Sequence, residues 1–285
     1  MLRSLFSGIS GLRANQTMLD VVGNNIANAN TAGFKASTVL FQDTLSQMMI
    51  GATGANADRG GTNPIQVGLG VQVAATHTNF QQGSSQVTGR ATDLMIQGDG
   101  FFVVQRGGET LYTRAGAFSF DEAGDLTTTK GGNRVQGYLL DAAGDPTGGL
   151  VDISLDTANA VPAVPVGVEM TSYEIGANGM VSANFDDGVR RDLCQLAIAD
   201  FNNPMGLNKI GETAFKESAN SGTPQLGVAG EGRRGTLMGN ALEMSNVDLA
   251  AEFTNLILAQ RGFQASSRVI TTSDQVLEDL VNIKR

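Results

Sequence analysis

The sequence contains few of the side chains on which enzymes and metal sites depend. Its 285 residues include one histidine, His77, and one cysteine, Cys194. A single histidine nearly excludes His-based metal sites and Ser-His-Asp triads, and a single cysteine excludes an internal disulfide framework. Paired-carboxylate chemistry stays open, but no pair of acidic residues stands out. We therefore interpret His77 as an incidental strand residue and Cys194 as a buried apolar thiol, and we predict no catalytic residue, metal site or cofactor.

Charge is also scarce. Charged residues make up 16% of the chain, against a typical ~25%, and the formal net charge is −9. Few charges indicate that much of the surface is covered by something, and an acidic surface makes nucleic acid an unfavourable partner. No apolar run reaches the ~18 residues of a membrane span, and the first ten residues lack the continuous apolar core of a signal peptide. We expect no membrane insertion, and a protein that is cytoplasmic or exported without a cleaved signal.

What the chain does have is a seven-residue apolar repeat near each end. The N-terminal repeat predicts a helix over about 2–28, and the C-terminal repeat predicts a helix over about 246–282. Ser245 and Asp248 suggest a capping box at the start of the second helix. We call the repeats the heptad rows and take them as the candidate assembly interface: Leu5, Leu12, Leu19 and Ile26, then Leu249, Leu256, Phe263, Ile270 and Leu277.

On spacing alone, the heptad rows suit an ordinary protein core as well as an interface between subunits. Two observations favour the interface. The C-terminal helix carries a second row, Val269, Val276 and Ile283, which two helices cannot bury together with both heptad rows. In addition, residues 1–34 contain only three charged side chains, and a segment with so little charge usually becomes ordered when a partner covers it.

Between the two helices the sequence predicts β structure and glycine-rich connections. Glycine is abundant, with 37 residues, and it weakens helices while supplying the positive φ of turns. We interpret residues 34–88 as an extended, irregular linker, and the stretch 146–171 shows no clear pattern. The expected strands are 101–105, 111–113, 117–120, 126–128, 134–140, 173–175, 180–185 and 189–201.

Together these elements predict an α+β protein. Residues 1–33 and 245–285 form a coiled-coil-like terminal helical domain, residues 34–88 and 230–244 form extended glycine-rich linkers, and residues 89–229 form a central all-β domain. Such a protein is expected to polymerise with copies of itself through its end helices. The remoter alternative is an extracellular glycan-binding or hydrolytic β domain with helical anchors.

Several motifs carry a family resemblance. The N-terminal region contains Asp-Val-Val-Gly-Asn-Asn-Ile-Ala-Asn (20–28) and Asn-Thr-Ala-Gly-Phe-Lys (30–35). The β region contains Asp-Gly-Phe-Phe (99–102) and Tyr-Thr-Arg-Ala-Gly-Ala-Phe (112–118). The C-terminal region contains Ser-Asn-Val-Asp-Leu (245–249), Ala-Gln-Arg-Gly-Phe (259–263) and Thr-Ser-Asp-Gln (272–275). In content and order these motifs resemble those of the flagellar rod and hook proteins, over essentially the whole chain.

The resemblance implies a structural subunit of the bacterial flagellar hook, a curved flexible tube that transmits motor torque to the filament. It implies the compact type without a large outer domain, with the distal rod protein of the basal body as the alternative. It also implies signal-less export through the flagellar type III apparatus and a position outside the cell in the hook or basal body. The implied partners are further copies of the chain, the distal rod protein, the hook cap protein and the hook–filament junction protein.

Overall fold

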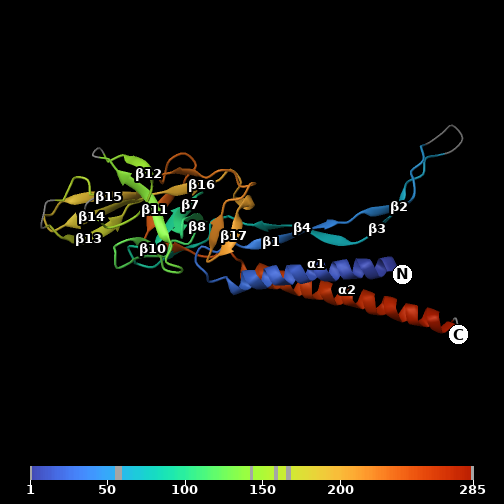
Figure 1. The fold of residues 1–285 in the computed structure, drawn as a ribbon. Helices are drawn as coiled ribbons and strands as arrows, with labels where there is room; N and C mark the ends of the chain where they lie inside the picture. Colours follow the sequence, from blue (N-terminus) through green and yellow to red (C-terminus); the bar gives the residue numbers. More distant parts are fainter. Residues whose placement is uncertain (1, 55–59, 142–143, 157–159, 165–167, 284–285) are drawn as a thin grey trace. The chain divides into compact units, whose positions relative to one another are not determined.

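The chain is organised as two compact units. The computed structural model describes residues 2–54, 60–141, 144–156, 160–164 and 168–283 (Figure 1). Unit 1 comprises Met1–Ala27, Ala36–Asn79 and Val247–Arg285, and unit 2 comprises Asn28–Lys35 and Phe80–Asn246. The chain therefore passes between the units four times, after residues 27, 35, 79 and 246.

Unit 1 contains the two long helices that the heptad rows predict. Helix α1 (Leu2–Ala27) and helix α2 (Leu249–Ile283) pack against each other. Helix α2 begins later than expected because Asp248 is its N-cap. The Asp248 carboxylate oxygen Oδ1 accepts hydrogen bonds from the backbone N–H groups of Ala250 and Ala251, at 2.9 and 3.3 Å. The prediction that the cap begins at Ser245 was therefore wrong by three residues.

The described residues of unit 1 also include four strands within the segment that the sequence predicted as an irregular linker. Strand β1 (Ser37–Asp43) pairs antiparallel with β4 (Val71–Thr78), and β2 (Ser46–Ile50) pairs antiparallel with β3 (Ile65–Gly68). The prediction of an irregular segment was therefore wrong. Strand pairing supplies hydrogen-bond partners to the extended backbone, and β-branched residues favour strands despite the glycines nearby. Residues 55–59 of the glycine-rich stretch lie outside the described residues.

Unit 2 consists mainly of strands, and the named strand pairs in its described residues are antiparallel. Its largest sheet has 13 strands, with the main path β13-β14-β15-β11-β7-β8-β18-β17. Strands β5 and β21, which fall in segments predicted as linkers, pair with each other, and β6 pairs with β20. A 3-10 turn, η2 (Pro204–Gly206), precedes β17. The strand bounds are β5 Ser85–Val87, β6 Leu94–Gln97, β7 Phe101–Arg106, β8 Glu109–Thr113, β9 Phe118–Phe120, β10 Leu126–Thr128, β11 Arg134–Leu140, β12 Pro146–Asp152, β13 Met170–Ile175, β14 Met180–Phe185, β15 Arg190–Leu196, β16 Ile198–Asp200, β17 Asn208–Gly211, β18 Ala214–Lys216, β19 Gln225–Gly227, β20 Thr236–Gly239 and β21 Ala241–Glu243.

Most of the predicted strands are present with nearly the predicted ends. The exception is the single strand predicted over 189–201, which is two strands. Strand β15 pairs with β11 and β14, whereas β16 pairs with β7 and β19, so the chain must change partners at Ala197. Strands β5, β6, β12 and β17 to β21 were not predicted. Strand β12 occupies part of the stretch 146–171, of which residues 157–159 and 165–167 lie outside the described residues.

The core of unit 2 covers both faces of β7. Phe102 and Val104 lie in one cluster of buried side chains, and Phe101 and Val103 lie in a second cluster. Because successive side chains of a strand point to opposite faces, an unbroken apolar run requires that both faces be covered. Cys194 belongs to the first cluster, and burial raises the pKa of its thiol to about 12. This confirms the interpretation of Cys194 as a buried apolar thiol.

Candidate assembly interface

The heptad rows are only partly buried within one chain. All of their residues are half-buried except Leu249, which is 43% exposed. Among the described residues of the helix pair, the buried side chains are mostly small or polar: Ala14, Val22 and Asn25 on α1, and Glu252 and Ala259 on α2. The helix pair therefore has a thin core, and both rows keep accessible apolar surface.

Small residues bring α1 and α2 close together and fix their register. A Cβ atom added to Gly262 would lie 2.5 Å from Oδ1 of Asn15, and one added to Gly8 would lie 3.1 Å from Cγ1 of Ile270. Both distances are shorter than an ordinary van der Waals contact, so a larger side chain at either position would require the facing side chain to move. Gly262 lies in the Ala-Gln-Arg-Gly-Phe motif, and the helix contact supplies a physical reason for glycine there.

Asn25 ties together three segments of unit 1. Its side-chain amide donates hydrogen bonds to the backbone oxygen of Ser37 (2.8 Å) and to Oε1 of Glu252 (3.0 Å), and its Oδ1 accepts one from the Ser37 N–H (3.0 Å). The end of α1, the start of β1 and the first turn of α2 are thereby joined. Burial raises the pKa of Glu252, and the hydrogen bond from Asn25 partly opposes this. This contact is not apparent from the sequence, because neither residue belongs to an apolar row.

Unit 1 exposes a large set of apolar side chains. Val269 and Val276, from the predicted second row of α2, are 43% and 48% exposed, while the side chain of Ile283 lies outside the described residues. Extended exposed apolar surface marks interaction sites in soluble proteins. The exposed set on the two helices is Phe6, Ile9, Leu249, Phe253, Ile257, Leu258, Val269, Val276, Leu280 and Val281, and on the strand segment it is Leu40, Phe41, Leu45, Met48, Met49, Ile50, Ile65, Val67, Leu69 and Val73.

Part of this exposed surface forms a groove between α1 and the β3–β4 segment. The groove has a volume of about 530 Å³ and lies entirely within unit 1. We call it the α1 groove. Its lining is mainly apolar, with one cationic side chain, and includes Phe6, Ile9, Arg13, Leu69, Val71 and Val73.

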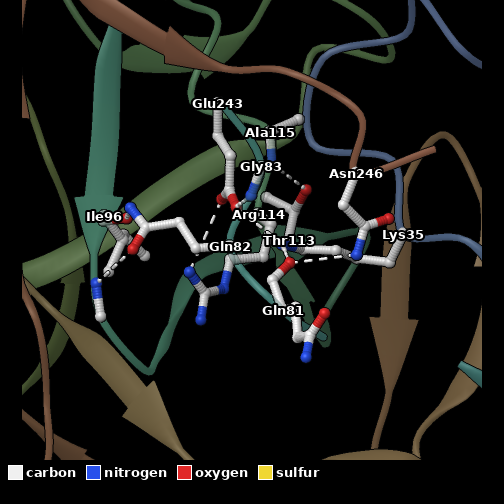
Figure 2. Close-up of polar contacts among 11 residues, drawn as sticks. Lys35, Gln81, Gln82, Gly83, Ile96, Thr113, Arg114, Ala115, Glu243 and Asn246 are labelled. Carbon is white, nitrogen blue, oxygen red and sulfur yellow. Dashed lines mark hydrogen bonds and ion pairs between the residues drawn. The ribbon is translucent and has the colours of Figure 1, made fainter. Parts of the chain in front are cut away.

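Unit 2 contains a buried ionic cluster around Glu243 (Figure 2). The Lys35 ammonium lies 2.6 Å from Oε1 of Glu243 and donates a second hydrogen bond to the backbone oxygen of Gln81, at 2.8 Å. The Gly83 N–H also donates to Oε1 (2.9 Å), and Nη1 of Arg114 lies 3.6 Å from Oε2. The side chains of Lys35 and Glu243 are completely buried. We call this the Lys35–Glu243 cluster.

The Lys35–Glu243 cluster joins separate segments of unit 2 through ion pairs and hydrogen bonds. Burial lowers the pKa of Lys35, and the hydrogen bond and charge of Glu243 oppose that shift. Burial likewise lowers the pKa of the Arg114 guanidinium, again opposed by Glu243. Lys35 and Arg114 therefore both depend on Glu243 to remain charged away from water. Lys35, Gln81 and Glu243 lie close in sequence to three of the four places where the chain passes between the units.

The described residues hold few groups suited to chemistry. His77 lies in β4 opposite Thr38, which confirms it as a strand residue. Within the described ranges, no group of three or more His, Cys, Asp or Glu side chains could hold a metal ion. Of the helices in the described part of the chain, none is long and apolar enough to span a membrane.

Three family models match the chain, in the same order as the motifs. Residues 5–35 match the flagella basal body rod protein, residues 95–183 match the D1 domain of the flagellar hook protein FlgE/F/G, and residues 238–283 match the C-terminal region of the flagellar basal body rod FlgEFG protein. The matches cover nearly all of α1, about half of the strands of unit 2, and the whole of α2.

Individual relatives match over their full length. The flagellar basal-body rod protein FlgG of Bacillus subtilis is 46% identical over 286 positions, covering 100% of both chains. From Borreliella burgdorferi, the rod protein FlgG is 35% identical over 289 positions and the flagellar hook protein FlgE is 32% identical over 441 positions, again covering 100% of each chain.

Proposed function

Because the chain belongs to the family of flagellar hook and basal-body rod proteins, we propose that it polymerises through unit 1 into the axial tube of the bacterial flagellum. The observation that carries the proposal is the apolar surface that unit 1 leaves exposed in a single chain. Neighbouring copies would cover the heptad rows and complete a coiled-coil-like packing that one helix pair leaves half open. Burial of such surface is the main driving force of protein association.

Within the axial tube, we propose the basal-body rod as the first assignment. The rod proteins of two organisms align with this chain over 286 and 289 positions, almost its own length of 285 residues. The hook protein of one of these organisms needs 441 positions, so it contains long insertions that this chain lacks. Chain length therefore supports the distal rod, which the sequence analysis held as the alternative.

The hook remains the second assignment, and one observation favours it. The hook protein FlgE of Borreliella burgdorferi matches 100% of this chain at 32% identity, close to the 35% of the rod protein from the same organism. A compact hook subunit would need only this shared part. The shape of the polymer separates the two assignments, because a rod is straight and a hook is curved.

We also propose that no side chain of this protein is catalytic. The relatives are named as rod and hook proteins, and within the described residues both His77 and Cys194 have ordinary structural environments.

The remaining expected partners are the hook cap protein, the hook–filament junction protein and the type III export apparatus.

The proposal is tested by placing a charge in a heptad row. Leu256 is half-buried in the single chain and would be buried further by a neighbour. An unpaired charge buried there costs several kcal/mol, so Leu256→Asp should abolish tube growth from concentrated purified protein, as seen by negative-stain electron microscopy. The control is Gln275→Asp, at an exposed position on α2 away from the heptad row, which should form tubes like the wild type.

Tyrosine fluorescence shows whether a variant is otherwise folded. The chain has no tryptophan, and its three tyrosines, Tyr112, Tyr138 and Tyr173, all lie in unit 2. Unfolding of unit 2 by Leu256→Asp would mean that the row is part of the monomer core. Normal tubes from this variant would show that the row is not an interface, and a wild-type protein that forms no tubes would contradict polymerisation. Straight tubes would support the rod, and curved tubes the hook.

A further inference from the structure

Helix α2 is longer than α1 and continues past its start. Helix α1 has 26 residues and α2 has 35. The register of the pair runs from Asn25 beside Glu252 to Gly8 beside Ile270. Continued at the same rise per residue, this register places the first residue of α1 level with about residue 276 of α2. Residues 278–282 therefore have no segment of α1 beside them, and Figure 1 shows α2 extending beyond α1. We call these residues the α2 overhang.

The α2 overhang has the composition of a docking segment. Leu280 and Val281 are 50% and 68% exposed, and they stand next to the exposed acids Glu278 and Asp279. Among the ion pairs of the described residues, none includes either acid. A helix end with apolar and acidic side chains and no cover suits an apolar groove with a cation at its side.

The α1 groove has the complementary composition. Phe6 and Ile9 are 66% and 40% exposed, and β4 contributes Val71 and Val73 on the other side. Arg13 is exposed beside them, and it too is absent from the ion pairs of the described part of the chain. The groove therefore offers a mainly apolar lining and one positive charge that belongs to no ion pair of the described residues.

We propose that the α2 overhang of one subunit docks into the α1 groove of a second copy of the chain, with Glu278 or Asp279 close to Arg13. The overhang cannot reach the groove of its own chain, because it leaves the helix pair beyond the start of α1, whereas the groove runs along residues 6–17. The two surfaces are different patches of one chain, so the contact is head-to-tail. Repetition of such a contact gives an open helical filament when the rotation between successive subunits does not close a ring, as the proposed tube requires. This inference rests on the proposed polymerisation and adds one specific contact between subunits to the heptad rows.

Site-directed crosslinking tests the contact. In a Cys194→Ser background, Ile9→Cys and Val281→Cys place one thiol in the groove and one on the overhang. Tubes mixed from the two single variants should give a disulfide-linked dimer on oxidation, and tubes of the chain carrying both should give a ladder of multimers. The control pairs Ile9→Cys with Leu258→Cys, which is 61% exposed on another part of α2 and should give no ladder.

Charge exchange provides the second measurement. Arg13→Glu should raise the protein concentration needed for tube growth by about tenfold or more, because like charges would face each other. Combining Arg13→Glu with Glu278→Arg and Asp279→Arg should restore most of the loss. Tubes that form without the Ile9–Val281 crosslink, or that crosslink through Leu258 instead, would overturn this contact while leaving polymerisation intact. A wild type that forms no tubes would contradict the proposed function itself.

Discussion

Large apolar side chains are treated differently in the two units. In unit 2, Phe102, Leu196 and Phe201 are completely buried, whereas in unit 1 Phe6, Leu45 and Val281 are 66%, 82% and 68% exposed. The buried apolar residues found in the described part of unit 1 are Ala14, Val22, Ala36 and Ala259, which are small or of moderate size. Since burial of apolar area is the main source of folding free energy, unit 2 has the core of an independent domain and unit 1 does not.

Charges show the same difference. The ion pairs of the described residues, from Lys35–Glu243 to Arg234–Glu231, all lie within unit 2. The two units therefore differ in how they treat both charged and apolar side chains. Unit 2 buries a large set of apolar side chains and contains the ion pairs of the described residues, whereas unit 1 keeps many large apolar side chains exposed. The substitutions below test whether this difference holds.

The largest effect is expected from truncating a buried aromatic ring in unit 2. Phe102→Ala should lower the free energy of unfolding by about 3–5 kcal/mol, because it removes buried apolar area and leaves a cavity. Urea denaturation followed by tyrosine fluorescence measures this. The matched change in unit 1 is Phe6→Ala, which should alter the unfolding of unit 2 by less than about 0.5 kcal/mol but weaken tube growth. Equal destabilisation by both variants would remove the distinction between the units.

A smaller effect is expected from the Lys35–Glu243 cluster. Lys35→Met keeps the length of the side chain but removes two charge-assisted hydrogen bonds, and should destabilise unit 2 by about 1.5–3 kcal/mol. The control is Lys216→Met, because Lys216 pairs with Glu109 at the surface, where side-chain exposures are 44% and 63%. An exposed pair contributes at most about 1 kcal/mol. If the two variants lost similar free energies of unfolding, the buried cluster would stabilise unit 2 no more than the surface ion pair does.

Cys194 provides a third test, with an effect near 1 kcal/mol. Cys194→Ser should destabilise unit 2 by about that amount or more, because it buries a hydroxyl in an apolar cluster. The native thiol, with its pKa raised to about 12, should resist thiol reagents at pH 8 and react once the protein unfolds. The unfolded thiol ionises from about its ordinary value of 9.0, so the contribution of Cys194 to stability should fall as the pH rises above that value. Rapid labelling of the native protein would contradict this burial.

The smallest effect concerns Glu252 in unit 1. Burial raises its pKa above the ordinary value of 4.5, so the folded form holds a proton more tightly than the unfolded form. The helix pair should therefore lose stability as the pH rises through the interval above 4.5. Glu252→Gln should remove this loss in helicity measured by circular dichroism of the assembled tubes, and the exposed Asp20→Asn should retain it. If the helicity of the wild type rose with pH over that interval, the predicted loss of stability would be contradicted.

Sequence patterns found the elements whose signal is local. The seven-residue repeats predicted both helices because a buried stripe on a helix recurs at nearly that period. Strands β10, β11 and β14 were predicted with the observed bounds because each is a compact run between turn residues. Strands β1 to β4 were missed because their faces are largely exposed, so alternation between apolar and polar residues is weak.

The polar contacts could not be predicted in the same way. Lys35 and Glu243 are 208 residues apart in sequence, and Asn25 and Glu252 are 227 apart. No periodic pattern joins single polar residues over such separations, and a lysine or glutamate is by default expected at the surface. The motifs that carry the family resemblance do contain Asn25 and Lys35, but not the reason for either residue, which is burial against a partner from the far end of the chain.

The four passages of the chain between the units have a mechanical consequence. A force that pulls unit 1 from unit 2 is shared by four covalent backbones, so each carries only part of the load. On the unit 2 side, the Lys35–Glu243 cluster links the anchoring segments of three of them through hydrogen bonds and an ion pair. A force on any one of these three passages is thereby distributed to the other two before it reaches the sheet. If a protease cuts one passage, three remain, and the subunit continues to transmit force between its parts.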